Sequence, residues 1–257
     1  MGHSCRVIEV SGLRVAPVKG LASVPRAGLR LETGGVPEDR RLFLLRDNGS
    51  VVTMRRFPTL TAVVPELDLV AATLTVTFPD GSDALSSLGS AGERVGAVLF
   101  GKARTGLVVE GAVAEVLSRY VGERLRLVLA ETVGVGWDEG PVSLLGHASV
   151  SAVGTPADPA GPDIARFRML VEVTGTQPFE EDTWVGRRVR LGTASVRISH
   201  PLQRCVVVDY RPSSGARDWE GIRTLSARRG ADHLTLGVIG EVQKAGDIHV
   251  GDPVELS

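Results

Sequence analysis

Apolar and polar residues alternate along much of the chain in short runs, a pattern typical of strands with one buried face. The first of these runs are "RVIEVSGLRVAPVKG", "AGLRLET" and "RRLFLLRDNGSVVTM". In the last run Asn48-Gly49 separates two apolar stretches and predicts a hairpin turn. Pro79-Asp80-Gly81 predicts a turn after another alternating segment. The pattern, together with frequent Gly, Pro and Val, predicts a mainly β protein.

A helical period interrupts this pattern at residues 110–123, "EGAVAEVLSRYVGE". The apolar side chains of the segment fall on one face, which comprises Val113, Val116, Leu117, Tyr120 and Val121. Gly122 supplies a C-terminal stop. We interpret the apolar face as core and expect further short helices at 143–153 and 222–230. The sequence therefore predicts only a few short α-helices among the strands.

A stretch rich in Gly, Ser and Ala at residues 83–97 is the best candidate for a domain boundary. It predicts a smaller β-rich N-terminal lobe over residues 1–95 and a larger lobe over residues 96–257. A chain of 257 residues is long enough for either one large domain or two modest ones. No internal repeat or low-complexity segment is present.

Charge and cysteine content narrow the classes of protein to consider. The formal net charge is −1 at pH 7 and acidic and basic residues are interleaved, so neither nucleic acid nor a membrane surface is expected as a partner. The N-terminus lacks the layout of a secretory signal, and no apolar run reaches membrane-spanning length. Cys5 and Cys205 could form one disulfide, but two cysteines suit a reducing setting better. We therefore expect a soluble, cytoplasmic protein.

Cys205 is the main candidate for chemistry, although generic motifs leave its role open. The chain carries no dinucleotide or P-loop fingerprint, and its five histidines show no zinc-site spacing. His200 stands five residues before Cys205 and could act as a base for a thiol nucleophile, or it could be a half-exposed histidine at a strand end. Cys205 itself could be an inert buried thiol, whereas the charge of Arg204 favours a thiolate.

Several segments, taken together and in order, resemble the MOSC family, which is named for the C-terminal domain of molybdenum cofactor sulfurases. They are "APVKG", "EDRRLFLLRDNGSVVTMRRFPTL", "ARFRMLVEVTG", "FEEDTWVG", "QRCVVVDYRPSSG" and "LGVIGEVQKAGDIHVGDPVEL". The resemblance includes the N-terminal β-barrel partner domain and is similar to the amidoxime-reducing components and related bacterial proteins. It implies a MOSC β-barrel over residues 96–257, preceded by the β-barrel-like partner domain over residues 1–95.

The resemblance also implies a molybdopterin site in which Cys205 supplies a thiolate to molybdenum. A soft thiolate suits such a metal, and metal binding keeps the sulfur deprotonated. Lys19, Arg55 and Arg168 match basic positions of the family that contact the cofactor, and Arg204 matches an arginine beside the ligand. Arginine forks bind phosphate or pterin acceptors in pairs, whereas lysine acts as a point charge. For any one of these residues alone, a surface salt bridge would be the simpler interpretation.

Some positions depart from the family pattern and are expected to change the polar lining of the pocket. Leu170 replaces an asparagine, and Ile239 stands where the family has a tyrosine. After Cys205 the spacing to Gly215 is kept, but the acidic residue of the loop has moved two positions forward, to Asp209. These departures place the occupancy of the cofactor site in question, while the fold assignment is unaffected.

Three functions follow as hypotheses. The first is a molybdenum-dependent oxidoreductase that reduces small N-hydroxylated or N-oxide compounds by oxygen-atom transfer. The chain ends at "GDPVELS" without a fused iron–sulfur domain, so electrons would come from a separate ferredoxin, flavodoxin or cytochrome b5-like protein. The second is a sulfur or molybdenum cofactor carrier that uses Cys205; this chain has no pyridoxal phosphate domain, so a partner would load the sulfur. The third is a MOSC scaffold repurposed without molybdenum.

Overall fold

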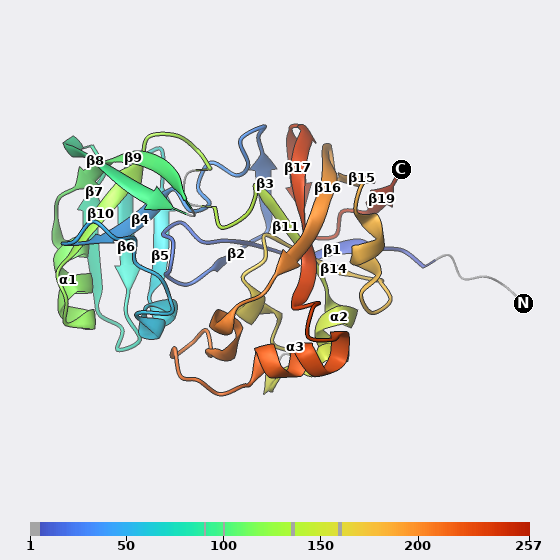
Figure 1. Ribbon diagram of the computed structural model, residues 1–257. Coiled ribbons are helices and arrows are strands. Elements are labelled where there is room, and N and C mark those ends of the chain that lie inside the picture. Colours follow the sequence, from blue (N-terminus) through green and yellow to red (C-terminus); the bar gives the residue numbers. More distant parts are fainter. Residues whose placement is uncertain (1–5, 90, 100, 135–136, 159–160) are drawn as a thin grey trace, which may run out of the picture.

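The computed structural model shows two β-rich lobes that lie side by side (Figure 1). The predicted mainly-β class with a few short helices is confirmed. Cys5, one half of the possible disulfide, lies outside the described residues, which are 6–89, 91–99, 101–134, 137–158 and 161–257. Within these ranges, no helix has the length and apolar character needed to cross a membrane.

The larger lobe is built on one eight-stranded sheet in the order β19-β15-β16-β17-β11-β14-β1-β2. Neighbouring strands are antiparallel except β11 and β14. A single cluster of buried apolar side chains takes members from strands along the whole sheet, so the sheet curls around one core. The strands are β1 (Glu9–Val15), β2 (Val24–Arg26), β11 (Val142–Gly146), β14 (Val171–Thr174), β15 (Arg188–Leu191), β16 (Ala194–Gln203), β17 (Thr235–Lys244) and β19 (Val254–Leu256).

Short elements cover the lobe, and Figure 1 shows two helices together at its lower end. These helices pack with the segment around Cys205 on a second apolar cluster, which includes Phe167 and Leu225. The elements are α2 (His147–Val153), α3 (Gly221–Arg229), the 3-10 helices η2 (Ile164–Phe167), η3 (Glu180–Trp184) and η4 (Val206–Asp209), and the paired strands β3 (Gly28–Leu31) with β18 (Gly246–His249) and β12 (Ala157–Asp158) with β13 (Gly161–Pro162).

The smaller lobe combines two antiparallel sheets and one helix around its own apolar core. Figure 1 shows α1 at the outer edge of this lobe, away from the larger one. The four-stranded sheet is β4 (Leu42–Arg46), β10 (Leu125–Ala130), β9 (Lys102–Val109) and β8 (Ala91–Leu99). The rest of the lobe is η1 (Pro58–Ala62), the three-stranded sheet β5 (Val64–Asp68), β6 (Thr73–Thr77) and β7 (Asp83–Ser87), and α1 (Ala112–Val121).

The chain divides between the lobes differently from the expected boundary near residue 95. At its start, β1 pairs with β14 and β2 and so belongs to the larger lobe. Farther along, the Gly-, Ser- and Ala-rich stretch is not a loop but forms β7 and β8, and the small lobe continues to β10. Its small residues allow close strand packing, because a Cβ on Gly92 would lie 2.6 Å from the carbonyl oxygen of Val108.

Local predictions agree with the structure. The predicted helix at 110–123 is α1, and Gly122 ends it in the left-handed conformation with φ 70°. The predicted shorter helices are α2 and α3, although the first residues of the 143–153 segment belong to β11. Around Asn48 the chain turns back after β4, where the backbone N–H of Arg46 donates to Ser50. Turns and helix ends were therefore readable from the sequence.

Candidate functional site

The loop that joins β10 to β11 carries two adjacent carboxylates, Asp138 and Glu139, between the lobes. An oxygen of Asp138 lies 2.5 Å from Nζ of Lys19, and its other oxygen lies 3.6 Å from Nε of Arg40. Lys19 and Arg40 follow β1 and β3 along the chain, so this loop contacts the segment that crosses between the two lobes. Asp138 therefore gathers two cations at the junction of the lobes.

Burial and charge act against each other in this group. Burial lowers the pKa of Lys19, and although Asp138 opposes the effect, repulsion from Arg40 and Arg168 adds to it. Burial also disfavours the charged form of Arg40. The negative charges of Asp39 and Asp138 outweigh this effect, so the pKa of Arg40 is raised. For Asp138 the cations outweigh burial, so its pKa is lowered. The group is consequently a set of mutually dependent charges.

Arg168 is the cation of this group whose charge has no recorded ion-pair partner among the described residues. Burial, followed by repulsion from Arg40, lowers the pKa of Arg168 to about 10. Among the described residues, none forms a hydrogen bond or ion pair with its guanidinium. Its backbone is left-handed, with φ 55°, which is unfavourable for a side chain other than glycine. We call Lys19, Arg40 and Arg168 the cation cluster. Among the described residues, the carboxylates recorded as acting on these three charges are Asp39 and Asp138.

Cys205 lies two residues after the end of β16, at the N-cap of η4, and is a free, half-buried cysteine. Its neighbour Arg204 is 8% exposed and donates to the carbonyl oxygens of Leu236 and Phe167. Burial lowers the pKa of Arg204 to about 10, and the charges of Cys205, Glu139, Glu181 and Asp138 oppose this effect in that order. Arg204 is thus held rigidly beside the thiol.

Glu139, next to Asp138 in the loop, contacts a histidine of the larger lobe. One of its carboxylate oxygens lies 3.2 Å from Nε2 of His200 on β16. The other ring nitrogen of His200 lies 3.0 Å from Oγ of Ser199, and the Ser199 hydroxyl donates to the carbonyl oxygen of Ile239. The two neighbouring carboxylates therefore link the cation cluster on one side to a histidine on the other.

The loop after Cys205 is held by two carboxylates, Asp209 and Asp218. Asp209 is 1% exposed and accepts from the guanidinium of Arg217 and from the backbone N–H groups of Gly221 and Ile222. Asp209 therefore stabilises the start of α3. The displaced acid that the sequence analysis singled out has a structural role in this chain.

A second carboxylate, Asp218, continues this network. It accepts from Arg166 and Arg211, and Arg166 also pairs with Asp163 and lies over the ring of Trp219. The cations outweigh the effect of burial, so the pKa of Asp218 is lowered. Every charge named in this loop has a partner of opposite sign.

Of the predicted site residues, Lys19, Arg168 and Arg204 all experience the charge of Asp138. Cys205 is the chain neighbour of Arg204, and its charge also acts on Arg204. Arg55 is exposed and has no recorded ion pair or hydrogen bond with the described residues, so its predicted contact stays a prediction.

Three members of the site were not predicted. Arg40 belongs to the Asp-Arg pair of the second resembling segment, which signalled it, but it was not singled out. Asp138 and Glu139 lie in a loop without a motif, and only the fold brings them to this position.

Leu170 and Ile239, the two positions that depart from the family pattern, are both buried. Leu170 is 2% exposed and packs in the barrel core, so it does not contribute to a polar lining. Ile239 is 4% exposed and lies under the loop, where a Cβ on Gly140 would come within 2.5 Å of it. Leu170 therefore adds no polar group to the site, and its expected effect on the polar lining of the pocket stays a prediction.

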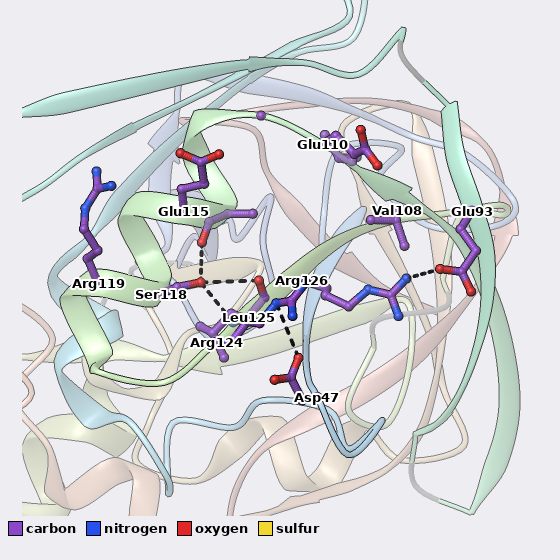
Figure 2. Close-up of a pocket in the computed structure, with 13 residues that line it drawn as sticks. Asp47, Glu93, Val108, Glu110, Glu115, Ser118, Arg119, Arg124, Leu125 and Arg126 are labelled. Atoms are coloured by element: carbon purple, nitrogen blue, oxygen red, sulfur yellow. Dashed lines mark hydrogen bonds and ion pairs between the residues drawn. The ribbon is translucent and has the colours of Figure 1, made fainter.

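Two recesses lie on the smaller lobe. One of about 850 Å³ lies beside α1 (Figure 2), and charged residues such as Glu115 and Arg126 line it. None of the cation cluster lines that recess. The other, of about 440 Å³, is bounded by the turn at Gly49 and by Val98, and it reaches Lys19. Only the second therefore adjoins the cation cluster.

The fold and these residues define a two-domain MOSC protein. A model of the MOSC N-terminal beta barrel domain matches residues 7–124, and a model of the MOSC domain matches residues 131–255. The chain therefore belongs to the MOSC family.

Several relatives are similar over different parts of the chain. Mitochondrial amidoxime reducing component 2 of Macaca fascicularis is 26% identical over 97% of this chain and 83% of its own length. The Bos taurus protein of that name is 31% identical over 46% of this chain, and the match spans only 37% of the bovine protein. Molybdenum cofactor sulfurase of Oryza sativa subsp. japonica is 23% identical over 90% of this chain, which spans 32% of the rice protein. The YUAD protein of Bacillus subtilis, a solved structure, matches over 97% of this chain and 95% of its own, with TM-score 0.46 and 12% identity.

Proposed function

We propose that this protein binds a molybdenum cofactor at the junction of its lobes and reduces small N-hydroxylated or N-oxide compounds. The observation that carries the proposal is the cation cluster together with Arg204, the chain neighbour of Cys205, whose guanidinium donates to the carbonyl oxygen of Phe167 next to Arg168. Relatives named for amidoxime reduction and for molybdenum cofactor sulfuration support it. A cytoplasmic location is part of the proposal.

The described residues fit such a cofactor. Arg168 offers a half-buried side chain with no recorded ion pair or hydrogen bond of its guanidinium among them, whereas Asp138 pairs with Lys19 and Asp39 pairs with Arg40. A partly exposed guanidinium without an ion-pair partner remains able to bind an anionic ligand such as a phosphate through charge-assisted hydrogen bonds. Lys19, Arg40 and Arg168 would therefore hold the anionic part of the cofactor.

Cys205 fits the metal end of the same group. In the described part of the chain, no cluster of three or more His, Cys, Asp or Glu side chains could hold a metal on its own. A single soft thiolate matches a metal whose other ligands come from the cofactor. Its neighbour Arg204 supplies a positive charge that is held in place by backbone carbonyls.

When bound, the cofactor would supply the chemistry that removes oxygen from an N–O bond and that accepts electrons one at a time. The chain's own task is then to bind and orient the cofactor. A separate donor of the ferredoxin, flavodoxin or cytochrome b5 type would deliver the electrons.

The proposal is tested by reduction of a model amidoxime with a chemical one-electron reductant. Protein produced in a host that makes molybdenum cofactor should form the amidine, and Cys205→Ala should abolish the reaction. Cys5→Ser serves as the matched cysteine control and should keep full activity. Equal turnover by Cys205→Ala would refute the role of this thiol.

A carrier of sulfur or cofactor is the second candidate, because a half-buried thiol beside Arg204 also suits a persulfide. Incubation with a pyridoxal phosphate-dependent cysteine desulfurase would then add the mass of one sulfur atom at Cys205. A mass increase together with absence of amidoxime reduction would favour the carrier over the reductase.

A further inference from the structure

Arg204 is a buried arginine whose guanidinium bonds to the protein on both of its edges. Its Nε and Nη2 donate to the carbonyl oxygen of Leu236 over 2.8 and 2.6 Å, and its Nη1 donates to that of Phe167 over 3.1 Å. Nη2 also contacts Sδ of Met169. Each nitrogen of the guanidinium therefore has a partner within the protein.

Two of these partners flank Arg168 in the chain. Phe167 precedes Arg168 and Met169 follows it, and both are buried. Because a peptide unit is planar, the bond to the carbonyl oxygen of Phe167 fixes the plane that carries the backbone nitrogen of Arg168. The guanidinium of Arg204 also lies over the ring of Phe167, 5.3 Å from its centroid. Arg204 thus holds the chain on both sides of Arg168.

Arg168 needs such support because its backbone is left-handed, with φ 55°. A residue with a Cβ keeps this conformation only where its surroundings enforce it. The N–H of Arg168 donates to the carbonyl oxygen of Ala165, so Arg168 forms the C-cap of η2. Since the backbone dihedrals set the direction of the Cα–Cβ bond, this turn decides where the half-buried guanidinium of Arg168 lies.

At its own backbone Arg204 is joined to Cys205 by a peptide bond. The N–H of Arg204 donates to the carbonyl oxygen of Leu234 over 2.7 Å, and the carbonyl oxygen of Cys205 accepts from the N–H of Val208 over 3.1 Å. These two bonds hold the segment that carries the thiol. One residue therefore connects the segment of Cys205 to the turn of Arg168.

We propose that Arg204 is a positioning residue that fixes Arg168 relative to Cys205 without touching the cofactor, an inference that rests on the proposed function. The anionic part of the cofactor would bind Arg168 and its metal would bind Cys205, so Arg204 sets the spacing between the two ends of the site. Lysine cannot replace Arg204, because the donors of lysine all lie on one nitrogen. The arginine fork reaches Phe167 and Leu236 from different nitrogens.

Binding of inorganic phosphate to the full chain, produced in a host without the cofactor and followed by ³¹P NMR, tests the proposal. Arg204→Lys keeps the positive charge but loses the fork, and it should weaken binding about tenfold, as should Arg168→Met. The double variant should bind no more weakly than Arg168→Met, because Arg204 acts only through Arg168. Arg229→Lys is the matched control and should leave binding unchanged, since Arg229 lies over Phe179 and pairs with Asp182.

Met169→Leu examines the same link without a change of charge, and it keeps the volume of the core if Arg204→Lys does not fold. Loss of the weak sulfur acceptor should weaken phosphate binding about threefold. Wild-type affinity in Arg204→Lys, wild-type affinity in Met169→Leu, or losses that add in the double variant would overturn the positioning role alone. A wild-type chain that binds no phosphate would overturn the anion site of the proposed function together with it.

Discussion

Arg166 and Arg168 stand two residues apart, yet their surroundings are opposite. Arg166 is 2% exposed, pairs with Asp163 and Asp218, and donates to the carbonyl oxygen of Val208. Arg168 has no recorded partner among the described residues and shares its surroundings with two other cations. The same side chain is therefore structural where the fold neutralises its charge, and available to a ligand where the fold does not.

Replacing each arginine with methionine separates these two roles most clearly. Arg166→Met breaks a buried network and should lower the free energy of unfolding by about 3 kcal/mol. Arg168→Met removes an unpaired cation and should change it by less than about 0.5 kcal/mol. Urea unfolding of the two variants measures both values. Equal losses would show that Arg168 has a structural role like that of Arg166.

Gly215, in the loop after Cys205, tests the contact between this loop and the smaller lobe. Gly215 has φ 71°, and a Cβ there would lie 2.3 Å from the carbonyl oxygen of Pro58. Gly122 has a similar φ of 70° with nothing within 4 Å, which makes it the matched control. Gly122→Ala should cost about 1 kcal/mol for the left-handed backbone. Gly215→Ala should cost about 2 kcal/mol or more, measured by urea unfolding, and equal costs would contradict the contact.

Stability against pH should distinguish two carboxylates near the site. Burial raises the pKa of Glu181, so its neutral form is favoured in the fold. Wild-type stability relative to Glu181→Gln should therefore fall as pH rises from about 4.5 through the native pKa. Urea unfolding between pH 4 and pH 7, a range chosen from the ordinary carboxyl pKa, measures the difference.

Asp138 should show the opposite sign, because its cations lower its pKa. Its contribution should be fully present above about pH 3.8 and be lost as pH falls through the lowered native pKa. The comparison is between wild type and Asp138→Asn in acid-unfolding curves. If the two curves coincide, Asp138 does not depend on Lys19 and Arg40 as the structure indicates.

Sequence reasoning identified the local elements and the residues that stand in recognisable motifs. Gly122 and Asn48-Gly49 carry their turn chemistry in their own conformational preferences, so the helix end and the hairpin were predictable. Lys19 and Cys205 stood in motifs of the family. Asp138 and Glu139, which complete the site, belong to no motif: Asp138 meets Lys19 across 119 positions of the chain.

The division between the lobes was harder to predict for the same reason. β1 pairs with β14, a partner far along the chain, and local alternation of apolar and polar residues cannot reveal such a pairing. The Gly- and Ser-rich stretch has a loop-like composition, but Gly92 within it allows the close approach of β8 to β9. Long-range packing decides both cases.

The central claim is that the guanidinium of Arg168, which has no recorded ion-pair partner among the described residues, and the thiol of Cys205 hold one molybdenum cofactor. Molybdenum and pterin per chain, measured in protein from a host that makes the cofactor, test it most directly. Wild type should contain about one molybdenum and one pterin per chain. Cys205→Ser should lose the molybdenum, and Arg168→Met should lose both the molybdenum and the pterin. The exposed Arg228→Met is the control and should match wild type. Undiminished molybdenum in Cys205→Ser, or neither component in wild type, would contradict the account.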